Sequence, residues 1–259
     1  MAFEVIDFHC HPFITDEERI GAYVDTVDMK TADFFAHMES AGVSLCCGSV
    51  IGPKVRSFAD LHTLNLHALA LRDRYPGRYL PGIHIHPGYV EESMREVDFA
   101  VANGVKMIGE LVPYHHGWED YSTPQFVEIM EYINGKNLLV NVHIASAADL
   151  EQMEKSVAAC TDTVFVLAHP GHGERLEKHI ELLGRYENVY LDLSGSGIDL
   201  FGALRRIIAA AGYERLLFGS DFPVTSVKTC AASVLSENLP DHVTECILSR
   251  NAKKLLGIL

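Results

Sequence analysis

The stretch IDFHCHP, residues 6–12, places two histidines two positions apart at the end of a short apolar run. In an extended strand, successive side chains alternate between two faces. His9 and His11 are therefore expected to point to one side with Asp7 below them, while Phe8 points to the other. Two imidazoles on one face can both reach a single divalent ion. Because such pairs also occur on ordinary polar surfaces, the meaning of this pair depends on the rest of the chain.

Short apolar runs alternate with helical patterns along the whole chain. Between the runs, apolar residues recur at helical spacing, as in Leu61, Leu64, Ala68 and Leu71. Eight strands alternating with helices over about 250 residues is the pattern of a (β/α)8 barrel. We therefore predict one barrel domain over residues 1–259. The predicted strands are Phe3 to Phe8, Val43 to Val50, Tyr79 to His86, Val105 to Glu110, Leu138 to His143, Val164 to His169, Val189 to Leu193 and Leu216 to Asp221.

A doubly wound open sheet is the competing architecture. Two features favour the barrel. The first strand is not followed by a Gly-x-Gly-x-x-Gly fingerprint. The polar residues also fall at the carboxyl ends of several different strands, which is where a barrel keeps its active site.

Four of the predicted strands end in an imidazole or a carboxylate. His9 and His11 end the first, His143 the fifth, His169 the sixth and Asp221 the eighth. A single histidine of this kind is usually an ordinary hydrogen-bonded residue. Five such groups at equivalent strand ends are typical of metal and catalytic sites. We therefore predict that the five side chains meet at one mouth of the barrel.

Composition limits the classes of partner. The formal net charge of −14 disfavours nucleic acid, because an acidic protein repels phosphate backbones. No apolar run is long enough to span a bilayer, and the N-terminus has no basic region followed by an apolar stretch. The expected partner is a small-molecule substrate, with no role for nucleic acid or membrane, and the chain could form a homo-oligomer.

Cysteine usage indicates a reducing compartment. The chain has six cysteines and no C-x-x-C pair, which predicts buried free thiols in a cytoplasmic protein. Cys10 lies between the two histidines of the opening stretch, and alternation places it on the opposite face. We therefore do not count it among the metal ligands.

The chain resembles the amidohydrolase superfamily, and most closely its amidohydrolase-2 branch. The resemblance implies a distorted (β/α)8 barrel and a divalent metal, most often zinc, with Mn²⁺ as the other candidate. It also implies that His9, His11, His143 and Asp221 are the ligands of a single-metal site and that His169 polarises the substrate or guides the nucleophilic water. The similar segments, in chain order, are Asp7 to His11, His143, His169 to Gly173, Gly219 to Pro223 and Asn251-Ala252.

Two segments depart from that branch. Ile108 to Leu111 and Gly82 to Pro87 are more similar to TatD-type metallohydrolases, in which a glutamate on the fourth strand bridges two metals. Glu110 is either such a bridge or the acceptor of a hydrogen bond from a ligand histidine. In the bridging case the ligands form two sets, His9, His11 and Asp221 around one ion and His143 and His169 around the other.

Five further histidines are candidates for substrate contact, and each has an ordinary explanation as well. His84 and His86 share one face of the third strand, and they fit equally well as polar residues at a barrel rim. His115 and His116 lie in the long loop after the fourth strand, where substrate-shaping residues occur, although exposed loop residues are as common there. His172 follows the histidine of the sixth strand closely enough to reach the site.

The predicted activity is metal-dependent hydrolysis of a small molecule with an amide, ester or lactone bond. A metal-bound water supplies hydroxide at neutral pH, with Asp221 as general base and His169 orienting the reacting group. The leading alternative is a decarboxylase of the aminocarboxymuconate-semialdehyde type. It normally needs a cation for the substrate carboxylate, and the only candidates are in loops, namely Lys54, Arg56 and Arg175.

The sequence is also compatible with two less favoured classes of protein. A TatD-like binuclear phosphoesterase or nuclease would use the same kinds of ligand, but the acidic net charge disfavours it. A protein that binds metal without catalysing a reaction is disfavoured by the implied open coordination position, which is a property of catalytic sites.

Overall fold

The computed structural model describes residues 3–52 and 55–259. Eight parallel strands are hydrogen-bonded in chain order within them. Backbone hydrogen bonds of 2.8 Å, from Phe8 N to Phe218 O and from Asp221 N to His9 O, join the last strand to the first. The predicted (β/α)8 barrel is therefore confirmed. The strands are β1 (Val5–Cys10), β2 (Val43–Gly48), β3 (Tyr79–Ile83), β4 (Met107–Leu111), β5 (Leu139–Val142), β6 (Val164–Ala168), β7 (Val189–Asp192) and β8 (Leu216–Leu217).

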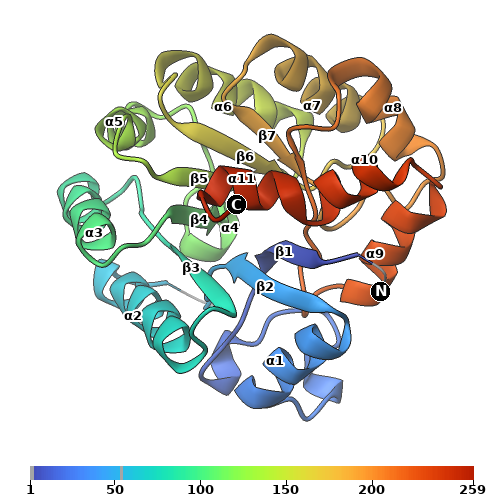
Figure 1. Cartoon of the computed structure of the whole chain (residues 1–259). Helices are drawn as coiled ribbons and strands as arrows, with labels where there is room; N and C mark the ends of the chain where they lie inside the picture. Colours follow the sequence, from blue (N-terminus) through green and yellow to red (C-terminus); the bar gives the residue numbers. More distant parts are fainter. Residues whose placement is uncertain (1–2, 53–54) are drawn as a thin grey trace.

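A ring of helices surrounds the strands (Figure 1). The helices in the described part of the chain are α1 (Thr31–Ser40), α2 (Phe58–Arg74), α3 (Val90–Ala102), α4 (Pro113–His116), α5 (Pro124–Ile133), α6 (Ala147–Ala159), α7 (Glu174–Arg185), α8 (Ala203–Ala211), α9 (Val227–Ser236), α10 (Asp241–Glu245) and α11 (Asn251–Leu256). Of these, α4 and α11 lie at the ends of the barrel and not in the ring. Two short 3₁₀ turns, Asp16–Glu18 and Val24–Thr26, lie in the connection between β1 and α1, and a π-helical turn at Cys246–Arg250 joins α10 to α11.

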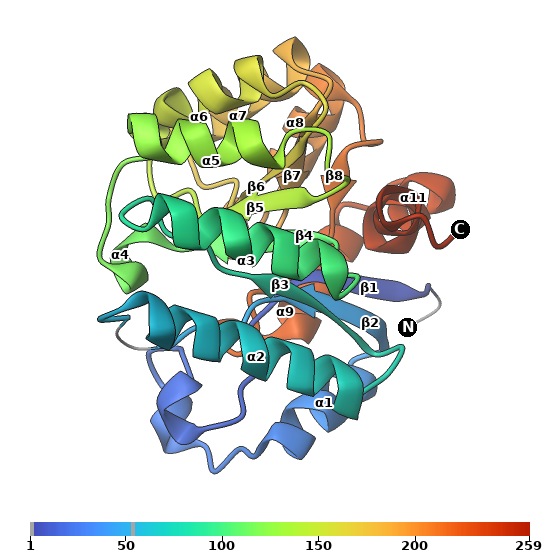
Figure 2. The same ribbon diagram turned by 90° about the vertical axis from the view of Figure 1, so that its left-hand side faces the viewer.

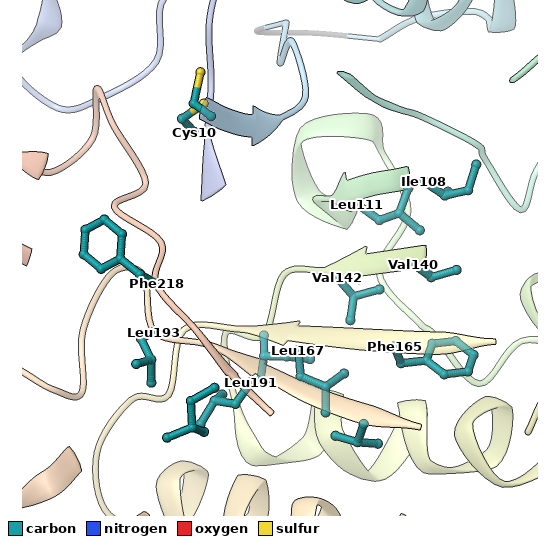
Figure 3. Close-up of a cluster of buried hydrophobic side chains, with 14 of the residues drawn as sticks. Cys10, Ile108, Leu111, Val140, Val142, Phe165, Leu167, Leu191, Leu193 and Phe218 are labelled. Carbon is teal, nitrogen blue, oxygen red and sulfur yellow. The ribbon is translucent and has the colours of Figure 1, made fainter. Parts of the chain in front are cut away.

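Apolar side chains fill both surfaces of the barrel wall. The outer surface packs against the helices, and Figure 3 shows part of it with Ile108, Val140, Phe165 and Leu191 from β4 to β7 and Phe218 directly after β8. A second cluster joins residues of six strands to α11, and we call it the interior cluster. It consists of Ile6, Phe8, Leu45, Cys47, Met107, Leu139, Val166, Leu217 and Ala252.

The interior cluster closes one end of the barrel. Ala252 belongs to it, and Leu255 and Leu256 of α11 pack against it. Figure 2 shows α11 and α4 at opposite ends of the barrel. Because α11 occupies one end, the other end, beside α4, is the one open to ligands.

The first strand does not keep the strict alternation that its sequence suggests. Alternation would place Phe8 and Cys10 in one cluster, but Phe8 lies in the interior cluster and Cys10 in the outer one. The pairing of β1 with β2 shifts register between Asp7 and Cys10. This irregularity lets His9 follow an inward-facing Phe8 and still face the mouth of the barrel, so the prediction that Phe8 and His9 take opposite faces is wrong.

Several strands are shorter than their sequence patterns predict. β3 ends at Ile83 instead of His86, and β8 ends at Leu217 instead of Asp221. The residues beyond these ends leave the regular strands, although Phe218 and Asp221 still hydrogen-bond to β1. A run of apolar residues cannot show where regular pairing stops. Helical spacing is misleading at one position as well. Leu200 has helical spacing with Leu204, but it precedes α8 and is 54% exposed.

Five of the cysteines are buried free thiols as predicted, and Cys246 is half-buried. None of the helices in the described part of the chain is long and apolar enough to cross a membrane.

The buried His179 makes the fold sensitive to acid. Its Nδ1 lies 3.0 Å from the carbonyl oxygen of Arg175 one turn earlier in α7. Burial lowers the pKa of His179 from 6.5 to about 3. His179 is therefore protonated near pH 6.5 in the unfolded chain but only near pH 3 in the folded chain. The free energy of unfolding falls as the pH is lowered from about 6.5 to about 3.

We expect His179→Asn to reduce this pH dependence. One group of this kind changes the free energy of unfolding by up to about 1.4 kcal/mol per pH unit. Between pH 6 and pH 5 the free energy of unfolding of the variant should therefore fall by roughly 1 kcal/mol less than that of the wild type. Urea unfolding at both pH values measures it. The control is His242→Gln on the exposed surface of α10. Equal slopes in wild type and His179→Asn would contradict the prediction.

Candidate metal centre

Six side chains from five strand ends meet at the open mouth of the barrel. Glu110 of β4 lies at the centre and is 2% exposed. The others are His9 and His11 at the end of β1, His143 after β5, His169 after β6 and Asp221 after β8.

The two carboxylate oxygens of Glu110 face two different pairs of histidines. Oε2 lies 3.2 Å from His9 Nε2 and 3.4 Å from His11 Nε2. Oε1 lies 3.0 Å from His143 Nδ1 and 3.1 Å from His169 Nε2. A single carboxylate is therefore shared between two groups of imidazoles.

Each group has the donor set that a divalent metal requires. The ligand atoms of His9, His11 and Glu110 all lie within 4.8 Å of one another, and so do those of Glu110, His143 and His169. Within each pair the imidazole nitrogens face one another across about 3 Å, 3.1 Å in the first and 3.0 Å in the second. Imidazole nitrogen and carboxylate oxygen are typical ligands of zinc and related ions. The residues thus fit a metal centre.

Asp221 joins the first group. Its Oδ1 lies 3.2 Å from His11 Nε2 and 3.6 Å from His9 Nε2. The side chain is 13% exposed, more than that of Glu110, so it also faces solvent in the mouth. Asp221 therefore contacts both the ligand cluster and the space where a substrate would bind.

Electrostatics hold the central carboxylate in its charged form. Burial opposes that charge, but the nearby His9 and His143 keep the pKa of Glu110 well below its usual range. In the same way, Glu110 and Asp192 raise the pKa of His9 well above 6.5 in spite of its burial. The carboxylates and the imidazoles of His9 and His11 therefore stabilise each other's charged forms. A cation would compete with protons for the imidazole nitrogens.

The outward-facing ring nitrogens are fixed by neighbours behind the cluster. His9 Nδ1 lies 2.6 Å from Asp192 Oδ2, and His11 Nδ1 lies 3.1 Å from the carbonyl oxygen of Ser49. His169 Nδ1 lies 3.1 Å from the hydroxyl of Ser194. These contacts orient each ring so that Nε2 is presented to the cluster, the usual arrangement around metal-binding histidines.

Asp192 was not predicted, although it is the buried carboxylate that orients His9. The one sequence feature that could have indicated Asp192 is its position as the acidic residue at the end of the apolar run of β7. Gly219 makes room for the contact. A Cβ there would lie 2.2 Å from Asp192 Oδ1 and 2.7 Å from the Cβ of His9, so any larger residue would displace the pair.

A cavity of about 430 Å³ lies in front of the cluster. Its wall includes ligand candidates and Arg19 of the loop between β1 and α1. Arg19 was not predicted, since it lies eight residues after His11 in a segment with no regular pattern. The remaining wall is largely apolar and aromatic, with Ile20, Ile51, Val112, Tyr114, His115 and Val224.

The five histidines proposed as substrate contacts fall in different places. His115 lines the cavity, whereas His84 and His116 are fully buried behind it with ring centroids 4.4 Å apart. His86 is half-buried, with Nε2 3.0 Å from the carbonyl oxygen of His116. His172 lies on the surface, 3.0 Å from Asp199.

The basic residues proposed for a substrate carboxylate are not among the described residues that line the cavity. Arg175 donates hydrogen bonds to the carbonyl oxygens of Ile144 and Ala145, and Arg56 lies before α2. Lys54 lies outside the described residues.

Barrel and site together define a metal-dependent enzyme of the amidohydrolase type. The profile of the family Amidohydro_2, amidohydrolase, matches residues 6–258, and the chain belongs to this family. No curated protein matches the sequence significantly.

Solved structures with the same fold share little sequence with this chain. A 5-carboxyvanillate decarboxylase from Sphingomonas paucimobilis is 15% identical with a TM-score of 0.74, over 99% of this chain and 100% of that one. A probable 2-pyrone-4,6-dicarboxylic acid hydrolase from Acinetobacter baumannii is 18% identical with a TM-score of 0.74, over 98% and 99%. A second 5-carboxyvanillate decarboxylase, from Novosphingobium aromaticivorans and containing manganese, is 12% identical with a TM-score of 0.67, over 98% and 97%.

We expect Asp192→Asn to weaken metal binding. An amide cannot accept the hydrogen bond from His9 Nδ1 with the same strength, and loss of such a contact typically lowers metal affinity by about 10- to 100-fold. Competition with a chromogenic chelator measures the affinity. The matched control is Asp199→Asn, which changes a carboxylate paired with the exposed His172 and should leave affinity unchanged. Equal affinities for both variants would contradict the role of Asp192.

Proposed function

We propose that this protein is a metal-dependent hydrolase that cleaves an amide, ester or lactone bond in a small molecule. The observation that carries the proposal is the position of Glu110, whose two oxygens face two separate histidine pairs. Shared carboxylates of this kind support two-metal sites for hydrolysis. In this proposal His9, His11 and Asp221 would hold one ion and His143 and His169 the other, with Glu110 shared between the two groups.

The bound metal would supply the nucleophile, because coordination lowers the pKa of water from about 16 to about 7. Asp221 would accept the proton of the attacking water, since its carboxylate lies beside His11 and lines the cavity. It would then return that proton to the leaving group, so that water adds across the scissile bond.

The role of His169 depends on the number of ions. Its Nε2 lies 3.1 Å from Glu110 Oε1 and its Nδ1 is held by Ser194, an arrangement that favours ligation. With a single ion at His9, His11, His143 and Asp221, the same side chain would be free to orient the substrate. We favour ligation, because the contact with Glu110 pairs it with His143.

Zinc is the proposed metal and Mn²⁺ the second choice. Four histidines and two carboxylates suit zinc, whose usual ligands are nitrogen, sulfur and oxygen. Manganese is present in the structure of the decarboxylase from Novosphingobium aromaticivorans, which has the same fold.

Decarboxylation of a small carboxylic acid is the second candidate function. Arg19 favours it, because its guanidinium lines the cavity and would supply the cation for a substrate carboxylate. Arg56 and Arg175, which the sequence suggested for this role, do not line the cavity. Two of the compared structures are named as decarboxylases of aromatic acids. Release of carbon dioxide separates this reaction from hydrolysis.

Metal content tests the bridging role of Glu110. We expect about two ions per chain in the wild type and about one in Glu110→Gln, because an amide seldom bridges two cations. Elemental analysis of protein purified without chelators measures the ratio. The control is Glu96→Gln, another buried carboxylate in contact with a histidine, here His62 at 2.9 Å. One ion in both wild type and Glu110→Gln would show a single-metal site.

Turnover tests the role of Asp221. We expect Asp221→Asn to lower kcat by about 100-fold or more, because the amide cannot accept the proton of water. The substrate screen should cover lactones, esters and amides, with assays of carbon dioxide from carboxylic acids and of cleavage of bis(p-nitrophenyl) phosphate. Circular dichroism would confirm that the variant is folded. Full activity in Asp221→Asn would rule out this mechanism, and phosphodiester cleavage alone would point to a phosphoesterase.

A further inference from the structure

Arg175 connects the three loops that follow β5, β6 and β7. It lies in the first turn of α7 and is not among the described residues that line the cavity. Its Nη1 donates hydrogen bonds to the carbonyl oxygens of Ile144 at 3.0 Å and Ala145 at 2.7 Å, in the loop after β5. Its Nη2 donates to the hydroxyl oxygen of Ser196 at 3.0 Å, in the loop after β7.

The guanidinium also packs directly against the loop after β6. A Cβ at Gly171 would lie 1.7 Å from Arg175 Nε and 2.3 Å from its Cζ, so glycine is needed to leave room for the guanidinium. The φ of +65° at Gly171 favours glycine as well. The amide of Gly171 donates to the carbonyl oxygen of Ser196 at 2.9 Å. The loops after β6 and β7 are therefore held to each other as well as to Arg175.

Each of these contacts lies close in the chain to a residue of the second histidine group or to its support. The carbonyl groups that accept from Nη1 belong to the two residues directly after His143. Gly171 lies two residues after His169. The contact in the loop after β7 lies two residues after Ser194, whose hydroxyl is 3.1 Å from His169 Nδ1. One side chain thus acts on all three loops that place this group.

The position of these loops matters because the second group is closely spaced. His143 Nδ1 and His169 Nε2 lie 3.0 Å apart, and they lie 3.0 and 3.1 Å from Glu110 Oε1. A Cβ at Gly195 would lie 2.6 Å from His169 Nδ1, so the loop after β7 has little room to move toward the ring. Metal sites require ligands that are held to within about 0.5 Å.

We propose that Arg175 is a positioning residue for the second metal ion and that it holds His143 and His169 in place through the backbone of these loops. The inference rests on the proposed function in taking the two histidines as ligands of that ion. Arginine suits this task because its planar fork presents several N–H donors in fixed directions, which lysine does not. Within the described residues its side-chain hydrogen bonds go to uncharged oxygens, so the fork itself accounts for its place.

The first group of ligands rests on different contacts. His9 is held by Asp192 at 2.6 Å, and His11 by the carbonyl oxygen of Ser49 at 3.1 Å. Neither partner lies in a loop that Arg175 contacts, since Asp192 ends β7 itself and Ser49 follows β2. Loss of Arg175 should therefore affect the two ions unequally, which a general loss of structure would not do.

Replacement of the metal by ¹¹³Cd²⁺ tests the proposal, because each bound ion gives its own nuclear magnetic resonance signal. We expect two signals from the wild-type protein. Arg175→Gln should keep one of them and lose or broaden the other. Competition with a chromogenic chelator should show a second ion that binds about tenfold or more weakly, the usual effect of losing a contact that orients a ligand. The affinity for the first ion should be unchanged.

Further variants separate the geometry of the fork from the charge. Arg175→Lys keeps the charge and should weaken the second ion about as much as Arg175→Gln. A purely electrostatic effect predicts instead that Arg175→Gln binds this ion more tightly, because a positive charge repels a cation. Ser196→Ala removes one contact and should weaken the second ion by a smaller factor, and it serves as the test if the Arg175 variants do not fold. The control is Arg185→Gln, at a pair with Glu154 at the other end of α7.

The outcomes also distinguish this inference from the proposed function. Two signals and wild-type affinities in Arg175→Gln would overturn the role of Arg175 and leave the proposed function standing, and so would an equal loss of both ions. A single signal in the wild type would contradict the two-ion site. Arg175→Gln would then have to weaken that one ion, through His143, for Arg175 to keep its positioning role.

Discussion

The carboxylate of Glu110 is the contact on which the rest of the site depends. It is buried, charged and within 3.4 Å of four imidazoles that come from three different strand ends. An isolated buried carboxylate is strongly disfavoured, and the neighbouring imidazoles compensate its burial. Each side of the cluster therefore compensates the other, and removal of the central charge would leave both sets of histidines without a partner.

Assembling this cluster requires strained backbone conformations at two of its residues. His169 and Asp221 have φ angles of +64° and +61°, a region that residues other than glycine seldom adopt and that costs on the order of 1–3 kcal/mol at each position. His169 directly follows the last residue of β6, whereas Asp221 lies four residues beyond the end of β8, and both side chains reach the cluster. The barrel contributes the rigid frame against which that strain can be held, since its inner and outer clusters fix β6 and β8.

Sequence predicted the barrel and most of the cluster, because both are encoded in short-range patterns. The apolar runs indicated the strands, and the polar residue at the end of each run indicated His9, His11, His143, His169 and Asp221, which share the mouth. What could not be predicted depends on neighbours that are distant in the chain. Asp192 matters because it lies 2.6 Å from His9, 183 residues earlier, and Arg19 because an irregular loop folds over the cavity. The true end of β8 and the register shift in β1 are likewise set by pairing between strands.

Two sets of residues line the cavity, one suited to the reaction and the other to recognition of the substrate. Metal ligands and Asp221 form the reactive side, where charge is balanced within the cluster, so they offer no obvious preference for one substrate over another. Arg19 and the apolar residues form the rest of the lining, built from the loops after β1, β2, β4 and β8. Loops at this end of a barrel change without disturbing the strands. The same set of ligands could therefore serve hydrolysis in one protein and decarboxylation in another, with the reaction decided by which bond of the substrate these loops place against the metal centre.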